Sequence, residues 1–157
     1  MESAERPLGG VYDPRAVAGK VADALSGVPL FAGLEPEELE QLAGRFREHT
    51  FPAGSAITRE GERGARILAF FIITAGTATV TRGETAIASL GPGDHFGEIA
   101  LFHDVPRNAT VTADADLSCL ALSSWEFRPF VEAHPMVAWQ LLETMSVRLA
   151  NAERLSV

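Results

Sequence analysis

The chain has 157 residues, of which 46% are hydrophobic and 22% are charged, and this composition fits a globular domain with a substantial core. A formal net charge of −8 argues against a nucleic-acid-binding face, because such a face needs clustered positive charge. The longest uninterrupted apolar run, 67–73, is too short to span a bilayer, so no membrane contact is predicted.

The N-terminus has no basic start and no apolar segment of the kind found in signal peptides. Cys119 is the single cysteine, so no internal disulfide can form, and this fits a reducing, cytoplasmic compartment. It lies in an alternating, strand-like run, where we predict a small buried hydrophobic side chain and no nucleophile.

Two helices are predicted before the first strand, over about 14–25 and from residue 36 onward. Residues 1–12 are polar and contain glycine and proline, which predicts a loose tail. A proline opens each helix, where its missing N–H costs nothing. The second helix has acidic residues in its first turn, as the helix dipole favours, and an apolar face formed by Leu39, Leu42 and Phe46.

Short β-prone runs punctuated by glycine follow between His49 and Ser123. Such evenly spaced strands are typical of a sandwich or jelly roll. We therefore predict a mainly β fold with flanking helices, in the form of a β-roll or jelly-roll barrel. The predicted strands are 55–59, 66–74, 77–82, 85–90, 110–113 and 117–122.

Helical patterns return at the C-terminal end. Ser124 can cap a helix through Glu132, Pro135 breaks or restarts it, and a last helix is predicted over 137–155. Apolar side chains in this last helix alternate at spacings of 3 and 4, as in a coiled-coil seam. The seam either joins two copies in a homodimer or packs on the barrel of its own chain; it consists of Leu142, Met145, Leu149 and Ala152.

The segment 96–111 carries the features that point to a function. A short apolar helix is predicted here, and its N-terminus offers free N–H groups and a partial positive charge to an anion. Gly97 has no Cβ, so the backbone can come close to that anion. Arg107 adds a planar donor fork that matches two phosphate oxygens. Glu98 would repel a phosphate, so its presence implies a ligand hydroxyl that needs an acceptor. A phosphate and a hydroxyl close together describe a sugar phosphate, such as a nucleotide ribose.

This segment resembles the phosphate-binding cassette of the cyclic nucleotide-binding domain family. The matching residues are Phe96-Gly97-Glu98-Ile99-Ala100-Leu101, then Arg107 after five residues, then Ala109-Thr110-Val111. The flanks at 28–34, 60–62, 76–78 and 90–94 are also similar to turns of the family, so the resemblance covers about 28–152. It implies a tail and helix over 1–27 and a cyclic nucleotide-binding domain, ending in hinge helices, over 28–157.

The resemblance also implies roles for individual residues. Glu98 would accept from the ribose 2′-hydroxyl, Arg107 would pair with the cyclic phosphate, and the N–H groups of Ile99, Ala100 and Ala109 would complete the cradle. In the family, a threonine after the arginine favours cGMP; Asn108 stands there, so we expect cAMP. The predicted ligand-binding residues are Phe96, Gly97, Glu98, Ile99, Ala100, Arg107, Asn108 and Ala109. No metal and no cofactor besides this ligand is expected.

Two stretches add structural hypotheses to this resemblance. Eleven residues separate Gly64 from Gly76, roughly three more than the family pattern, which indicates a longer strand or a bulge beside the pocket. Among the aromatic residues of the C-terminal helices, Trp139 is a candidate lid that could stack on a purine base.

The resemblance implies a sensor and not an enzyme, in which the ligand orders the cassette and moves the C-terminal helices. No recognisable effector segment accompanies the domain, so the expected partner is an unidentified effector protein or a second copy. One alternative is a fold that no longer binds nucleotide and acts only as a protein-interaction module. The other is a small-barrel enzyme with a metal held by His95, Glu98 and His103.

Overall fold

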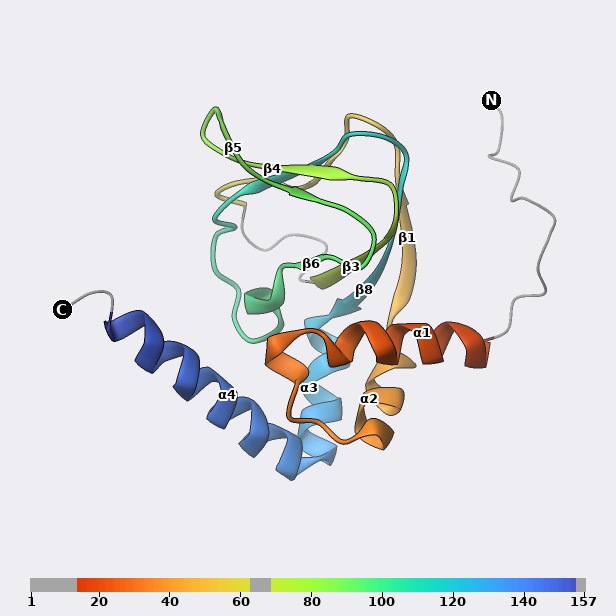
Figure 1. Ribbon diagram of the computed structural model, residues 1–157, viewed down its shortest axis with the longest axis vertical. Coiled ribbons are helices and arrows are strands. Elements are labelled where there is room, and N and C mark those ends of the chain that lie inside the picture. The colour runs from red at the N-terminus through yellow and green to blue at the C-terminus, as the bar shows by residue number, and fades with distance from the viewer. Residues whose placement is uncertain (1–13, 63–68, 155–157) are drawn as a thin grey trace.

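The computed structural model describes residues 14–62 and 69–154, and Figure 1 shows their arrangement. The chain begins with two α-helices and a short 3-10 helix, continues through the strands, and ends with two further α-helices. In order these are α1 (Pro14–Ser26), η1 (Pro29–Phe31), α2 (Pro36–Ala43), β1 (Arg47–Phe51), β2 (Ala56–Thr58), β3 (Ala69–Ala75), β4 (Ala78–Arg82), β5 (Thr85–Leu90), β6 (His95–Phe96), η2 (Glu98–Leu101), β7 (Thr110–Ala113), β8 (Leu117–Ser123), α3 (Ser124–Ala133) and α4 (Pro135–Arg154).

The strands form two antiparallel sheets, one in the order β1-β8-β3-β6 and the other in the order β2-β7-β4-β5. β3 is apolar from Ala69 to Ile73, and both of its faces are buried along this stretch. Phe71 and Ile73 face the core between the sheets, and Phe70 and Ile72 face the core under the helices. This architecture confirms the predicted mainly β roll with flanking helices.

The helices cover one side of this roll, and Figure 1 shows α1, α2 and α3 gathered there. Aromatic rings make the junction between helices and sheet. Phe31 of η1 meets Phe70 of β3 edge-on, with ring centroids 5.7 Å apart, and also contacts Phe127 of α3. Such rings bury large apolar areas and favour edge-to-face contacts, so this junction holds the helices against the sheet.

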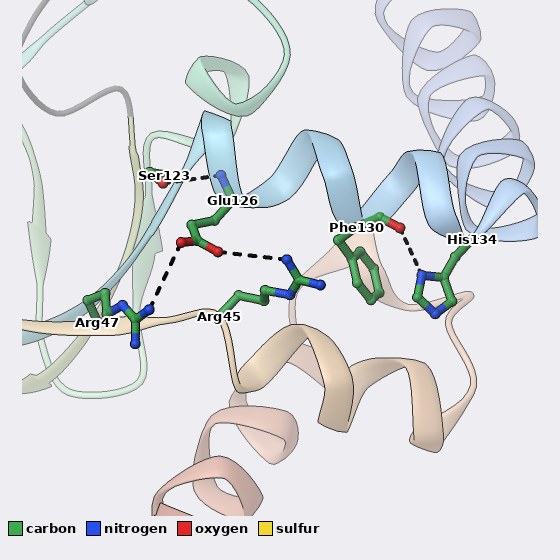
Figure 2. Close-up of polar contacts among 6 residues, drawn as sticks. All are labelled: Arg45, Arg47, Ser123, Glu126, Phe130 and His134. Carbon is green, nitrogen blue, oxygen red and sulfur yellow. Dashed lines mark hydrogen bonds and ion pairs between the residues drawn. The ribbon is translucent and has the colours of Figure 1, made fainter.

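Polar contacts fix the start of α3 against the segment that follows α2 (Figure 2). The Ser123 hydroxyl accepts from the Glu126 N–H at 3.3 Å, and the Glu126 carboxylate lies 3.7 Å from Arg45 and 4.0 Å from Arg47. The predicted cap was wrong by one residue, because Ser123 is the N-cap and Ser124 is the first helical residue.

α3 ends where His134 turns back onto it. The His134 ring pairs through Nδ1 with the Phe130 carbonyl oxygen at 2.8 Å and stacks on the Phe130 ring (Figure 2). Pro135 then begins α4, which fits the expected break or restart at this proline. His134 therefore has a structural role at the joint between the two C-terminal helices.

Two strands, β1 and β6, were not predicted from the sequence, and the second predicted helix was too long. β1 is polar and mostly exposed at the edge of its sheet, so it lacks apolar alternation. β6 has only two residues. α2 ends at Ala43, before Phe46, which is buried beyond the helix.

The long stretch between Gly64 and Gly76 is described only in part, since 63–68 lie outside the described residues. Within it, the register of β3 against β8 shifts between Ile73 and Ala75, which is the irregularity that a bulge produces. The predicted tail at 1–12 and the end of the last helix beyond Arg154 also lie outside the described residues.

Cys119 is fully buried on β8, as predicted. Burial raises the pKa of its thiol to about 12, with a further contribution from the charge of Glu48, so the thiolate form is scarce at neutral pH. Within 14–62 and 69–154, no helix combines the length and apolar character needed to cross a bilayer.

The predicted seam on α4 is exposed. Val137 and Leu141 face the core, whereas Leu142 and Leu149 are 59% and 60% exposed. These two leucines of the seam are therefore not packed tightly against the described part of the chain.

Candidate functional site

Gly97 connects β6 to η2 in a conformation that favours glycine. Its φ is +85°, in the left-handed region. A Cβ at this position would lie 2.8 Å from the Ala69 carbonyl oxygen and 3.1 Å from Nη1 of Arg107. The space that a side chain would need at this position is therefore taken by the β3 backbone and by the arginine.

Arg107 is half-buried and held in place by its backbone. Its N–H donates to the Glu62 carbonyl oxygen at 3.1 Å, and its own carbonyl oxygen accepts from the Gly61 N–H at 2.7 Å. Nη2 donates to the Ala69 carbonyl oxygen at 3.4 Å. Burial lowers the pKa of Arg107, and the charges of Glu62 and then Asp104 act in the opposite direction, so the guanidinium remains a cation at neutral pH.

The residues after Arg107 are tied to neighbouring turns. Arg82 Nε donates to the Asn108 carbonyl oxygen at 3.1 Å, and the Thr110 hydroxyl accepts from the Glu60 N–H at 2.9 Å. The Glu60 carboxylate in turn accepts from the Gly83 N–H at 2.8 Å. These bonds fix the backbone on which the arginine and Asn108 are presented.

Glu98 lies at the start of η2 with its two carboxylate oxygens in different surroundings. Oε1 accepts from Nη2 of Arg148 on α4 at 3.1 Å. Oε2 is shielded from solvent, has no hydrogen-bond partner among the described residues, and lies 4.0 Å from Nδ1 of His95. A buried acceptor without a donor is costly, so this oxygen suits a ligand that supplies a hydroxyl.

These residues surround a hollow of about 310 Å³, which is at the lower end of the ~300–1,000 Å³ typical of small-molecule sites. A cation and a carboxylate both line it, as a ligand with a phosphate and a hydroxyl requires. The full lining is Gly97, Glu98, Ile99, Ala100, Val105, Pro106, Arg107 and Asn108.

Two of the predicted residues support the hollow without lining it. Phe96 stacks on Phe71 with ring centroids 5.0 Å apart, and Ala109 is buried. Val105 and Pro106 also line the hollow and were not predicted. Both belong to the five residues that connect Leu101 to Arg107, and this connection has to return the chain to the site.

The N–H of Ala100, predicted as part of the phosphate cradle, is used within η2. It donates to the Gly97 carbonyl oxygen at 3.2 Å. One N–H can be shared between two acceptors at a helix end, so a phosphate at this position would share this donor or take it over from Gly97.

A second hollow of about 370 Å³ separates the cassette from α4, and it adjoins the first because Glu98 and Ile99 line both. Its other lining residues are Leu30, Phe102, Met145, Arg148 and Leu149. Trp139, the candidate lid, does not line either hollow; it is 60% exposed and its Nε1 donates to Glu143 on the same helix.

The metal alternative required His95, Glu98 and His103 to converge. His95 approaches Glu98 only to 4.0 Å. In the part of the chain that the structure describes, no three histidine, cysteine or acidic side chains are grouped as a metal site would need.

Comparisons with known proteins all indicate the same family. Residues 48–134 match the family model described as the cyclic nucleotide-binding domain. The chain is 38% identical over 114 residues to a cyclic nucleotide-gated potassium channel of Mesorhizobium japonicum, covering 73% of this chain and 31% of the channel. It is 31% identical over 134 residues to the cyclic AMP receptor protein of Thermus thermophilus, covering 82% of this chain and 61% of that protein.

A solved structure agrees with these relatives. The N-terminal domain of a transcriptional regulator from Streptomyces coelicolor A3(2) superposes with a TM-score of 0.76 at 29% identity, over 86% of this chain and 96% of that one. Of the two relatives named above, the chain spans less than a third of the length of the potassium channel and about three fifths of the cyclic AMP receptor protein.

Proposed function

This chain belongs to the cyclic nucleotide-binding domain family, and from this premise we propose that it is a sensor whose hollow between Gly97 and Asn108 binds cAMP in preference to cGMP. The observation that carries the proposal is that Arg107 and Glu98 line one hollow of suitable size. The domain would comprise residues 28–157, after a tail and helix over 1–27.

The charges of the site fit the two ends of a cyclic nucleotide. The Arg107 guanidinium would bind the cyclic phosphate with charge-assisted hydrogen bonds, with the N–H groups of Ile99, Ala100 and Ala109 as further donors. Oε2 of Glu98 would accept from the ribose 2′-hydroxyl, which would satisfy a buried acceptor that has no donor among the described residues.

The preference for cAMP rests on Asn108, which lines the hollow at the position where a threonine favours cGMP in the family. Its amide can donate and accept, so it can meet the phosphate or a purine edge. The relative from Thermus thermophilus is named for cyclic AMP, which supports this choice.

Calorimetric titration of nucleotide-free protein with cAMP, cGMP and 2′-deoxy-cAMP tests the proposal. We expect micromolar or tighter binding of cAMP and weaker binding of cGMP. Glu98→Ala should weaken cAMP binding about 10- to 150-fold, the equivalent of a lost charge-assisted hydrogen bond. The 2′-deoxy ligand should bind less tightly than cAMP to wild type but nearly as well as cAMP to Glu98→Ala.

Glu132→Ala is the matched control, because Glu132 is an exposed carboxylate paired with Arg128 on α3, and this variant should bind like wild type. An equal penalty for the 2′-deoxy ligand on wild type and Glu98→Ala would contradict the role of Glu98. No binding to verified nucleotide-free protein would favour the alternative of a degenerate fold that acts only as a protein-interaction module.

Signalling requires a partner, and the exposed seam of α4 supports a homodimer. The substitution Leu142→Glu should convert a dimer into a monomer in analytical ultracentrifugation, because Leu142 is exposed and lines neither hollow and burying a leucine is worth about 1.5–3 kcal/mol. Val147→Glu is the control, since Val147 is equally exposed but lies outside the seam. A wild-type protein that is monomeric at all concentrations would contradict the dimer and favour a separate effector protein.

A further inference from the structure

The imidazole of His95 and one carboxylate oxygen of Glu98 face each other at the ligand site. Nδ1 of His95, on β6, lies 4.0 Å from Oε2 of Glu98, on η2. This separation is longer than the ~2.7–3.2 Å of a hydrogen bond between nitrogen and oxygen, so the two groups are close but not bonded. A rotation about the side-chain bonds of either residue can bring them into contact.

Neither group has another hydrogen-bond partner among the residues that the structure describes. Oε2 of Glu98 is shielded from solvent and accepts from no donor there. The His95 ring forms no hydrogen bond within 14–62 and 69–154, and it packs on the ring of Phe70 with centroids 5.7 Å apart. A buried acceptor and a ring with donor capacity therefore stand side by side, each unsatisfied by the described part of the chain.

The charge of His95 changes with pH, whereas that of its charged neighbours does not. Oε1 of Glu98 accepts from Arg148, and Arg107 lines the same hollow as Glu98; a guanidinium keeps its proton in proteins. β3, with which His95 is paired, carries no charged side chain. A histidine ordinarily changes its charge between pH 5 and 8, so a change of pH in this range acts on Glu98 through His95.

This charge decides how much Glu98 gains from a ligand hydroxyl. A buried acceptor without a donor is costly, and a hydroxyl that donates to it relieves the cost. A neutral imidazole at 4.0 Å leaves Oε2 without a donor, so the hydroxyl contributes fully. A protonated imidazole carries N–H on both ring nitrogens and is attracted to the carboxylate, so it can donate to Oε2 itself. The hydroxyl then meets an acceptor that is already satisfied, and its contribution falls.

We propose that His95 is a specificity-determining residue of the site: its neutral form lets Glu98 distinguish a ribose from a 2′-deoxyribose, and its protonated form supplies the donor that the ribose hydroxyl would otherwise supply. This inference rests on the proposed function and adds to it a dependence of ligand recognition on pH. It concerns the hydroxyl alone, because the charge of His95 acts equally on the phosphates of ribose and deoxyribose ligands.

Calorimetric titration with cAMP and 2′-deoxy-cAMP at about pH 8 and about pH 5.5 tests the inference. The measured quantity is the ratio of the dissociation constant of 2′-deoxy-cAMP to that of cAMP. In wild type we expect a ratio of about 10 to 150 at the higher pH, and a ratio at least about fivefold smaller at the lower pH. Ionic strength is held constant, and the lower pH lies above the range in which ordinary carboxyl groups take up protons.

Two substitutions of His95 fix the site in each of its two forms. His95→Phe keeps an aromatic ring beside Phe70 but has no donor, so its ratio should stay high at both pH values. His95→Gln places an uncharged amide donor near Oε2 of Glu98, so its ratio should be low at both pH values. Each variant predicts by itself that the pH dependence disappears, so one of them suffices if the other does not fold.

His103→Gln is the matched control, because His103 is exposed and does not line the hollow that Glu98 lines. Its ratio should follow that of wild type at both pH values. Glu98→Ala has no carboxylate to satisfy, so its ratio should be about 1 at both pH values.

The remaining outcomes each overturn the inference. A wild-type ratio that is equal at the two pH values, or higher in acid, would remove the role of His95 and leave the proposed function intact. A pH dependence that persists in His95→Phe and His95→Gln, or disappears in His103→Gln, would assign the effect to another group. Wild-type protein that binds neither nucleotide at about pH 8 would overturn the proposed function and this inference together.

Discussion

Arg107→Ala is expected to raise the dissociation constant for cAMP by about 100-fold or more, because two charge-assisted hydrogen bonds to the phosphate are worth ~1.5–3 kcal/mol each. The loss is larger than for a surface arginine, since the guanidinium is half-buried beside the Ala69 carbonyl oxygen. Its removal also leaves the carboxylates of Glu62 and Asp104 near the site without this cation. Calorimetric titration of the wild type and the variant measures the change.

Two further variants show what the arginine contributes. Arg107→Lys keeps a positive charge but cannot present two parallel donors, so its affinity should fall between those of wild type and Arg107→Ala. Arg128→Ala should leave binding unchanged, because Arg128 is exposed and paired on α3. Binding of cAMP by Arg107→Ala within about threefold of wild type, less than 1 kcal/mol, would show that the phosphate does not lie at this guanidinium.

Gly97→Ala is expected to reduce both stability and nucleotide binding. A left-handed backbone costs a non-glycine residue about 1–2 kcal/mol, and overpacking adds about 1–3 kcal/mol. The overpacking arises because the new Cβ would lie 2.8 Å from the Ala69 carbonyl oxygen, a backbone atom of β3, and 3.1 Å from Arg107. The midpoint of urea unfolding measures the first effect, and titration with cAMP the second.

Gly93→Ala separates the two contributions. Gly93 also has a positive φ, +90°, but a Cβ there would meet nothing within 4 Å, so only the backbone cost applies. We expect a smaller loss of stability than for Gly97→Ala and nearly unchanged affinity. Equal effects of the two substitutions would mean that the contact between Gly97, β3 and Arg107 does not shape the site.

The core of the site could be predicted because its residues are neighbours in the chain. Gly97, Glu98 and Arg107 fall within one short segment, so a strand end, a tight turn and a returning loop bring them to one hollow. The alternation of glycine with short β-prone runs likewise indicates a roll of antiparallel strands. Local preference and spacing determine such features, and both can be read from one stretch of sequence.

Contacts that depend on distant parts of the chain could not be predicted in this way. β1 is polar and forms by pairing with β8, which lies far from it in the sequence. Arg148 likewise reaches Glu98 across 50 positions of sequence. The sequence of α4 by itself determines a helix with more than one apolar stripe. Only the tertiary structure decides which stripe is buried, because η1 and α3 pack against α4 and bury Val137 and Leu141, whereas Leu142 stays exposed.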